Sequence, residues 1–545
     1  MDRQSGAISE GAAAPQEFDV VVVGAGFSGL YALHKLRNEM GLRVRVLDKA
    51  GGIGGTWYWN RYPGARCDSE SYYYSYSFSP ELEQEWEWTE RYPDHHEIRR
   101  YLNFVADKFE LRSDIQLDTA VAGAAFDEDA NQWVIATEGG DTFRARFFIS
   151  AVGCLSNANV PDVPGLERFE GNWYHTGQWP HEGVDLSGKR VGQIGTGSTG
   201  IQVAPEVAKV AAHLTVFQRT ANYSVPARNA PLTEEFKRDV KENYREIRAW
   251  AKRMTNGHPF NIRDASVLDF DDHERTALLE EAWATGGLRF RSAFRDVLSS
   301  REANDKVSDF IRDKIREAVS DPKTAAKLTP NDHGYATKRP PIDTHYFEAF
   351  NNEHVDVVDL KAEPLVEISA QGIVTEAREY PVDVIIFATG FDAFTGAVLG
   401  LNIQGRGGQP LADAWAAGPR NYLGLQVPGF PNFFTITGPG SPSVLCNMPV
   451  AIEQHVEWIA GCIGHMVEAG LSVIEPSAEA ADEWVAHANE AANGTLLPQA
   501  SSSWYLGANI PGKPRIFMPY AGGMNRYASI CEDVVEDGFR GFQLR

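Results

Sequence analysis

Two stretches of the chain repeat the same order of apolar runs and helical spacing. In the first, 18–23 and 44–47 are apolar-rich runs typical of buried strands, and leucines recur at helical spacing over 30–36. In the second, 190–194 and 214–217 predict strands on either side of another helix. Each stretch predicts a strand–helix–strand unit, so the chain is expected to have an α/β fold with two Rossmann-like units.

The turn after the first strand carries the glycine pattern G-x-G-x-x-G. Gly24 allows a tight turn, Gly26 lets the backbone approach a pyrophosphate, and Gly29 lets the helix pack on the strand. Free N–H groups at the start of the helix attract phosphate. Asp48 follows Gly29 by about 20 residues, where a carboxylate accepts hydrogen bonds from a ribose diol. The first unit therefore predicts a dinucleotide site.

A second glycine pattern, Gly195, Gly197 and Gly200, opens the second helix. The position expected to be acidic now holds Arg219, which cannot accept hydrogen bonds from a ribose diol but can pair with a 2′-phosphate. The alternative is an ordinary solvated arginine at a strand end. Because Arg219 stands at the position that distinguishes a ribose diol from a 2′-phosphate, the sequence favours NADPH over NADH. Two such sites predict a flavoenzyme with FAD at the acidic site and NADPH at the basic one.

The pattern changes again between these units. Residues 223–336 are charged, helical and poor in glycine, which is typical of a solvated cover that shapes a site without taking part in its chemistry. The run 143–153 ends in Gly153 and the apolar part of 382–392 ends at Gly390, and both runs are interpreted as hinges. The chain from about 391 is expected to be loop-rich with one helix around 451–469. The predicted division is a disordered tail (1–16), an FAD-binding domain (17–153 and 389–545), an NADPH-binding domain (154–222 and 337–388) and a helical insertion into the latter (223–336).

Composition narrows the function classes. A formal net charge of −23 over 545 residues argues against nucleic acid or an anionic membrane as partner. Five scattered cysteines without paired or zinc-ligand spacing indicate no metal site and a reducing, cytoplasmic location. The first 16 residues lack the apolar core of a signal peptide, and no apolar run reaches the roughly 18 residues of a membrane span. We expect a small-molecule substrate and no obligatory protein partner.

The absence of a redox cysteine pair disfavours a disulfide reductase, so a reduced flavin would pass electrons to oxygen, a quinone or another protein. An enzyme that uses oxygen needs a site closed to water and a fixed cation. Two stretches offer such groups: the aromatic-rich 54–78, and 335–341 with Lys338 and Arg339 adjacent. Adjacent basic residues on a solvated surface are the alternative.

Two further motifs make a resemblance specific. Phe169, Gly171, His175, Trp179 and Pro180 form F-x-G-x-x-x-H-x-x-x-W-P, and 54–68 reads G-G-x-W-x-x-x-x-Y-P-G-x-x-x-D. Together, in this order beside the two glycine patterns, they resemble the type I Baeyer–Villiger monooxygenases, class B flavoproteins of the phenylacetone, steroid and cyclohexanone monooxygenase branch.

The resemblance implies that NADPH and O2 convert a cyclic, aryl or steroid-like ketone to an ester or lactone through a C4a-peroxyflavin, with sulfoxidation as a side activity. It assigns Arg339 the stabilisation of the peroxyanion and Asp68 the positioning of that arginine. It makes His175 part of an interdomain linker rather than a catalytic base. Two alternatives stay open: a flavin N- or S-hydroxylating monooxygenase, and a non-catalytic FAD- and NADPH-binding redox sensor.

The same resemblance assigns binding residues. Those for FAD are Gly24, Gly26, Ser28, Gly29, Asp48, Thr56, Trp57, Asp68, Tyr74, Val121 and Met448. Those for NADPH are Arg66, Cys67, Asp68, Thr196, Gly197, Ser198, Thr199, Gly200, Gln202, Arg219, Thr220, Lys338, Arg339 and Trp504. Those for the substrate pocket are Ser441, Pro442, Ser443, Val444, Leu445 and Trp504.

Several of these positions have plain structural alternatives. Trp57 and Tyr74 would also suit a core, Val121 a strand and Met448 a loop. Cys154 and the pair Pro340–Pro341 depart from the family pattern on the substrate side, which puts the substrate range in doubt but not the reaction class.

Overall fold

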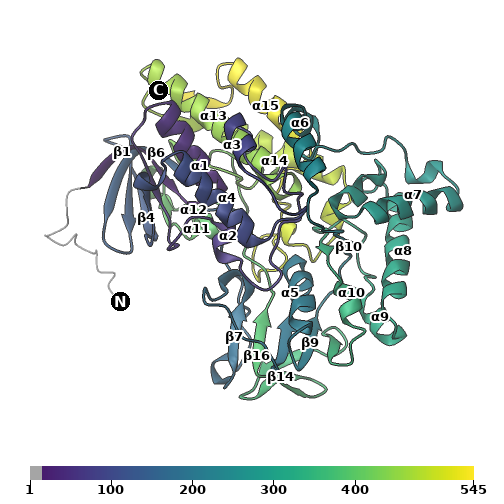
Figure 1. The fold of residues 1–545 in the computed structure, drawn as a ribbon. Helices are drawn as coiled ribbons and strands as arrows, with labels where there is room; N and C mark the ends of the chain where they lie inside the picture. Colours follow the sequence, from purple (N-terminus) through teal and green to yellow (C-terminus); the bar gives the residue numbers. More distant parts are fainter. Residues whose placement is uncertain (1–14) are drawn as a thin grey trace.

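The computed structural model describes residues 15–545, which fold mainly around two sheets, a larger mixed sheet and a smaller parallel one (Figure 1). The expected tail falls largely on residues 1–14, which lie outside the described residues, and Gln16 already begins the first strand. The two sheets confirm the predicted α/β fold with two Rossmann-like units.

The larger sheet has eight strands in the order β17-β4-β5-β6-β1-β2-β3, with β18 also paired to β6. β1 runs parallel to β2 and β6, so Val23 at its end lies beside Leu47 and Ser150. β5 is antiparallel to both of its neighbours, β4 and β6. The strands are β1 (Gln16–Val23), β2 (Val44–Leu47), β3 (Ile115–Gln116), β4 (Val121–Asp127), β5 (Gln132–Thr137), β6 (Thr142–Ser150), β17 (Ile403–Gln404) and β18 (Phe433–Thr435).

The second sheet has five parallel strands in the order β12-β9-β8-β16-β7. They are β7 (Asn172–His175), β8 (Arg190–Ile194), β9 (His213–Gln218), β12 (Val355–Asp359) and β16 (Val384–Phe387). The run 382–392, which we interpreted as a hinge, therefore contains β16, an inner strand of this sheet. Helices α1 (Phe27–Leu33) and α5 (Ser198–Ala208) follow β1 and β8, as the two glycine patterns predict.

The motif at 169–180 contains a strand that its sequence pattern does not indicate. Residues 169–180 have no strand period, yet 172–175 form β7 at the edge of the second sheet. The strand has only four residues, and its exposure runs from exposed Asn172 and Trp173 to buried His175 without alternating. A short edge strand paired on one side leaves no periodic pattern in the sequence.

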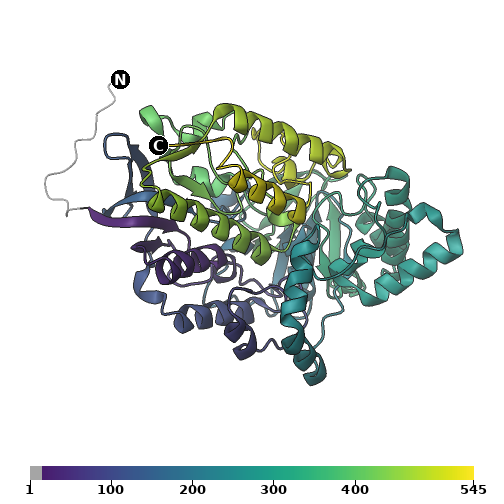
Figure 2. The same cartoon turned by 90° about the horizontal axis from the view of Figure 1, so that it is seen from above.

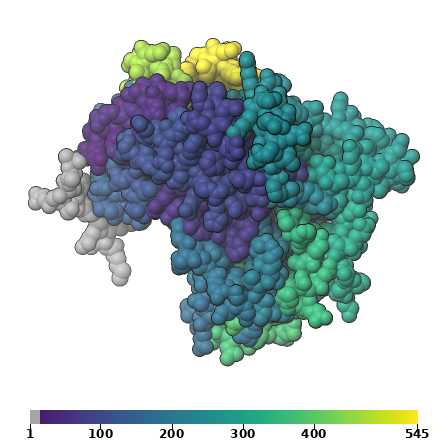
Figure 3. Space-filling view, in the orientation of Figure 1, coloured from purple at the N-terminus to yellow at the C-terminus, as the bar shows by residue number. Residues whose placement is uncertain are grey.

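The charged segment contains α6 (Glu234–Arg253), α7 (Asp272–Thr285), α8 (Arg301–Ala318) and α9 (Pro322–Leu328), and lies along one side of the molecule (teal in Figure 3). Its helices pack on both sheet units. Tyr244 of α6 belongs to an apolar cluster with Tyr72 and Tyr73, whereas α8 shares a core with α5. In addition, Arg248 of α6 forms a buried ion pair with Glu83 at 2.7 Å.

The C-terminal part contains more helix than its sequence predicts. The expected helix is α13 (Met448–Glu468), but α14 (Ala478–Asn493) and α15 (Met524–Glu536) were not predicted (Figure 2). The buried face of α14 consists mainly of alanines around Trp484, and that of α15 combines Met524, Tyr527 and Cys531 with one valine. Neither face has the leucine, isoleucine or valine stripe by which helices are recognised.

Short elements connect these layers. They are α2 (Thr56–Trp59), α3 (Pro80–Glu85), α4 (His95–Lys108), α10 (Tyr346–Ala349), α11 (Gly396–Leu399), α12 (Leu411–Ala414), β10 (Val225–Pro226), β11 (Ile342–Asp343), β13 (Leu365–Ile368), β14 (Gly372–Thr375), β15 (Glu379–Pro381), β19 (Ile474–Pro476) and β20 (Phe542–Leu544). Within residues 15–545, no helix is long and apolar enough to cross a membrane.

Candidate active site

The turn between β1 and α1 has the geometry that a pyrophosphate site requires. Gly24 has φ +116°, and a Cβ there would lie 2.4 Å from the carbonyl oxygen of Ala151. A Cβ on Gly29 would lie 1.7 Å from the carbonyl oxygen of Gly24, so strand and helix are too close for a side chain. No side chain caps α1 at its N-cap Gly26, which leaves the first N–H groups for phosphate oxygens. The loop fits the diphosphate of FAD.

Asp48 lies just beyond β2 with its carboxylate buried. Its two oxygens accept hydrogen bonds from the N–H of Ala25 at 2.6 Å and of Ala50 at 2.8 Å. Burial raises the pKa of Asp48, while these two N–H groups and Lys49 lower it. Each carboxylate oxygen has further acceptor capacity. The side chain is thus held in place and can still accept hydrogen bonds from a ribose diol.

The second glycine loop repeats this geometry. Gly195 has φ +110°, and a Cβ there would lie 2.3 Å from the carbonyl oxygen of Ala388. A Cβ on Gly200 would lie 2.3 Å from the carbonyl oxygen of Gly195. By contrast, no atom lies within 4 Å of a Cβ on Gly197, which is the uncapped N-cap of α5. The open side of the loop fits a second diphosphate.

Residues 54–68 connect the two units. The Gln202 amide of α5 donates to the carbonyl oxygen of Arg66 at 3.1 Å and accepts from the Tyr62 hydroxyl at 2.9 Å. In the second loop itself, the Thr196 hydroxyl donates to the carbonyl oxygen of Thr220 at 2.8 Å. The aromatic-rich stretch thus touches the helix that would hold the NADPH diphosphate.

Positive side chains gather beyond the end of β9. Arg219 is exposed directly after this strand. Burial lowers the pKa of Lys338 to about 8; Asp332 raises this pKa, and the nearby Lys361 and Arg219 cations lower it. A phosphate would offset the excess positive charge. The cluster therefore fits the 2′-phosphate of NADPH.

Arg339 and Asp68, 271 positions apart in the sequence, are in contact in the structure. The distance between Arg339 Nη2 and Asp68 Oδ2 is 3.5 Å, and the side chains are 27% and 11% exposed. Arg339 Nη1 also donates to the carbonyl oxygen of Val444 at 2.9 Å. Burial lowers the pKa of Arg339, but the Asp68 carboxylate more than offsets this and holds the pKa above its usual range. The guanidinium is a fixed cation.

An apolar wall lies beside this cation. Val444 belongs to a buried cluster with Cys154, Phe394 and Tyr505, and Leu445, Met448 and Trp504 pack against it. The Trp504 ring stacks on Phe394 with centroids 5.6 Å apart. Ser441 and Ser443 are fully buried at its edge. Most of the expected pocket residues are therefore in one place, and Cys154 lies among them.

The aromatic residues expected at FAD also contact one another. The Trp57 indole N–H donates to the Tyr74 hydroxyl at 3.2 Å, and both side chains are buried. Met448 is the first residue of α13 and Val121 the first of β4. The Arg66 guanidinium donates to the carbonyl oxygen of Tyr92 at 2.7 Å. The contacts of these side chains with a cofactor stay a prediction.

The motif at 169–180 packs against β16 and the residues on either side of it. A Cβ on Gly171 would lie 2.5 Å from the carbonyl oxygen of Asp383, and one on Gly177 would lie 2.6 Å from the Phe391 ring. His175 Nδ1 accepts from the N–H of Gly177 at 3.0 Å, and burial lowers the pKa of His175 to about 4. His175 is therefore neutral at pH 7 and is the last residue of β7, and its place in an interdomain linker stays a prediction.

Three residues near Arg339 were not predicted from the sequence. Tyr505 is buried, and burial raises its pKa. The Arg339 and Arg291 cations lower the pKa of Tyr505 in part. His258 Nε2 lies 3.3 Å from the Ser69 hydroxyl, next in sequence to Asp68. Burial lowers the pKa of His258 to about 3, and Arg291 and Arg339 lower it too. Arg291 and His258 belong to the charged segment 223–336, so that segment supplies charged and polar groups to the site.

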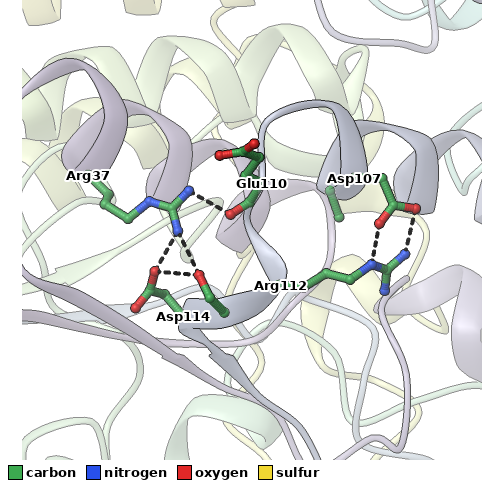
Figure 4. A pocket seen from close by; sticks show the side chains of 7 residues that line it. Arg37, Asp107, Glu110, Arg112 and Asp114 are labelled. Atoms are coloured by element: carbon green, nitrogen blue, oxygen red, sulfur yellow. Dashed lines mark hydrogen bonds and ion pairs between the residues drawn. The ribbon is translucent and has the colours of Figure 1, made fainter.

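A separate groove lies on the outside of the first unit, beside α4 (Figure 4). Its arginines are engaged locally, Arg37 with Asp114 and Arg112 with Asp107, each pair 2.5 Å apart. Arg37 also donates to the carbonyl oxygen of Glu110 at 2.9 Å. These contacts engage both arginines of the groove, and the groove contains none of the expected site residues.

Comparison with known proteins agrees with this geometry. Residues 17–229 match the family model described as flavin-binding monooxygenase-like. A Baeyer–Villiger monooxygenase of Pseudooceanicola batsensis is 46% identical over 96% of this chain and 95% of its own length. A cyclohexanone 1,2-monooxygenase of an Acinetobacter species is 42% identical over 97% of each chain. A phenazine N-monooxygenase of Lysobacter antibioticus is 43% identical over 97% of each chain.

Solved structures extend the similarity to three dimensions. An oxidized steroid monooxygenase bound to NADP matches with a TM-score of 0.92 and 49% identity, over 97% of this chain and 99% of the other. A complex of OTEMO with FAD and NADP matches with a TM-score of 0.94 and 37% identity, over 98% of this chain and 100% of the other. Both glycine loops, the Arg339–Asp68 pair and these similarities lead to one assignment: the chain belongs to the flavoprotein Baeyer–Villiger monooxygenases.

Proposed function

We propose that this chain uses FAD, NADPH and O2 to insert one oxygen atom beside the carbonyl group of a ketone. The atoms balance when ketone, O2, NADPH and a proton give an ester or lactone, NADP+ and water. The observation that carries the proposal is the cation of Arg339, held by Asp68 and by the carbonyl oxygen of Val444 beside an apolar wall.

Bound FAD, once reduced by NADPH, supplies the activation of O2. Arg339 stabilises the negative charge that develops on oxygen as it adds to the ketone carbonyl, and a guanidinium keeps its charge throughout. Asp68 orients Arg339 and offsets the cost of burying it. The wall of Val444, Phe394 and Tyr505 excludes water from the reacting atoms.

The cofactor contacts belong to the same proposal. The first loop with Asp48 would hold the FAD diphosphate and ribose, and Trp57, Tyr74 and Met448 would line the flavin. The second loop would hold the NADPH diphosphate, and Arg219 with Lys338 its 2′-phosphate. The division into an FAD-binding and an NADPH-binding domain is part of this proposal, supported by the two separate sheets. Five unpaired, buried cysteines support a reducing, cytoplasmic location.

N-oxygenation is the second candidate, because one relative at 43% identity is named a phenazine N-monooxygenase. An electron-rich nitrogen attacks an electrophilic oxygen, so its oxidation does not need Arg339 to stabilise a developing anion. A panel of cyclic, aryl and steroid-like ketones, with a phenazine and a sulfide, separates the two functions by product mass per NADPH consumed. Esters from ketones support the proposal; an N-oxide without any ester overturns it.

A further inference from the structure

The segment between α7 and α8 lies against both sides of the candidate active site. The buried ring of Phe290 packs edge-on against Tyr335, four positions before Arg339, with centroids 5.5 Å apart. Further along, the carbonyl oxygen of Leu298 accepts from the N–H of Leu496 at 2.8 Å, and Leu298 packs against the apolar wall. The segment therefore runs from the stretch that leads to Arg339 to the apolar wall, and Arg291 follows the first of these contacts directly.

Arg291 lies in this segment without a partner. Its neighbours in sequence are paired: Arg289 with Glu70 and Arg295 with Asp264, each at 2.9 Å. Within residues 15–545, no carboxylate lies within 4 Å of the Arg291 guanidinium, and no hydrogen bond to it is formed. Burial lowers the pKa of Arg291, and the other groups that shift this pKa are Tyr335, Tyr505 and Arg339, none of them a carboxylate.

An unpaired cation beside a second cation is costly in a partly buried site. Arg291 cannot relieve the cost by losing its proton, and Asp68 is already engaged by Arg339. An anion bound in front of Arg291 would offset both the desolvation and the repulsion from Arg339. The 2′-phosphate of NADPH does not fit this role, because its cluster of Arg219, Lys338 and Lys361 forms a separate group. The substrate is the other component that enters this space.

We propose that Arg291 binds a carboxylate carried by the substrate, so that the preferred substrates are keto acids. This inference rests on the proposed function, because it assigns the substrate class of the same site. The planar fork of a guanidinium matches a carboxylate with two parallel hydrogen bonds. Arg291 would hold the carboxylate end of the molecule, and Arg339 would face the carbonyl end.

The test compares 4-oxocyclohexanecarboxylate with 4-methylcyclohexanone, which has a similar ring without the charge. In the wild-type holoenzyme we expect a higher kcat/KM for the keto acid. Arg291→Met should lower that value by about 10- to 100-fold, the size of a hydrogen bond between charged groups, and should lower kcat/KM for the neutral ketone much less. Arg291→Lys should retain part of the preference. Arg295→Met, which removes an exposed arginine of the same segment, should change either value by less than about twofold.

A second readout does not depend on turnover. The keto acid should raise the melting temperature of the oxidised, NADP+-loaded wild-type enzyme and not that of Arg291→Met. Equal losses for both ketones, a higher KM for NADPH in Arg291→Met, or the same thermal shift in both proteins would overturn the inference. If the wild type oxygenates only the neutral ketone, the inference fails and the proposed function stands. If it oxygenates neither ketone, the panel of cyclic, aryl and steroid-like ketones decides the proposed function, and the thermal shift still decides whether Arg291 binds the acid.

Discussion

Replacing Asp68 by asparagine removes the negative charge beside Arg339 and keeps the size of the side chain. Asp68 Oδ2 is 3.5 Å from Arg339 Nη2, while Asp68 Oδ1 is buried without a hydrogen-bond partner. The carboxylate therefore interacts with the protein mainly through Arg339. In Asp68→Asn the guanidinium keeps its bond to the carbonyl oxygen of Val444 and can still donate to the amide oxygen, but the opposite charge beside it is gone.

The size of the effect follows from this distance. At 3.5 Å, two unit charges attract each other by about 5 kcal/mol at an effective dielectric constant of about 20. Removing one partner of a buried pair costs about 3–5 kcal/mol in measured cases. Both figures are upper bounds here, because Arg339 is 27% exposed and the contact is long for a hydrogen bond. We expect a loss of about 100-fold in ester formation, equivalent to about 2.7 kcal/mol.

The assay measures ester formed and NADPH consumed with saturating ketone, and the FAD content of the purified protein. Asp68→Asn should bind FAD, consume NADPH and form little ester, because the flavin still reacts with O2 while the cation is misplaced. Asp127→Asn is the matched control, since Asp127 pairs with Arg144 at 3.2 Å on the first sheet. Wild-type ester yield in Asp68→Asn would refute the positioning role.

Three further predictions concern NADPH. Arg219→Ala should raise the KM for NADPH far more than that for NADH in steady-state assays, because only NADPH has the 2′-phosphate; equal changes would remove the basis for the cofactor assignment. Lys338 has a pKa of about 8, so it loses its charge as pH rises from 7 to 9, and the KM for NADPH should rise by up to about tenfold per pH unit while that for NADH stays flat. In Arg219→Ala this rise should begin at a higher pH, since one cation that lowers the pKa of Lys338 is gone. His175→Ala should slow anaerobic flavin reduction by NADPH in stopped-flow spectra more than it alters the ester formed per reduced flavin; an unchanged reduction rate would argue against a role in coupling the two units.

Local sequence patterns predicted much of the fold. The ends of β2 and β8 agree with the predicted runs, because both strands keep enough buried apolar residues to stand out although β2 contains Arg45 and β8 contains Gln193. α14 was missed since alanine dominates its buried face, and β7 since four residues at a sheet edge carry no period. Such elements are fixed by the surfaces on which they pack and not by their own pattern.

The site was predictable only in part. The glycine loops and Asp48 act through local geometry, so their spacing was sufficient. Arg339 and Asp68 meet across 271 positions, and only the family resemblance brought them together before the structure did. Arg291 has the sequence context of a surface arginine, and its lack of a partner becomes visible only when the segment is placed beside Arg339.

The most direct test of the central claim is oxygen-isotope labelling. The wild-type holoenzyme is supplied with NADPH, a ketone of the panel and ¹⁸O2, and the product is analysed by mass. The proposal predicts an ester or lactone with a single ¹⁸O atom for each NADPH consumed, and loss of this product but not of bound FAD in Arg339→Ala. Consumption of NADPH without labelled ester, or labelled ester at the wild-type rate in Arg339→Ala, would contradict it.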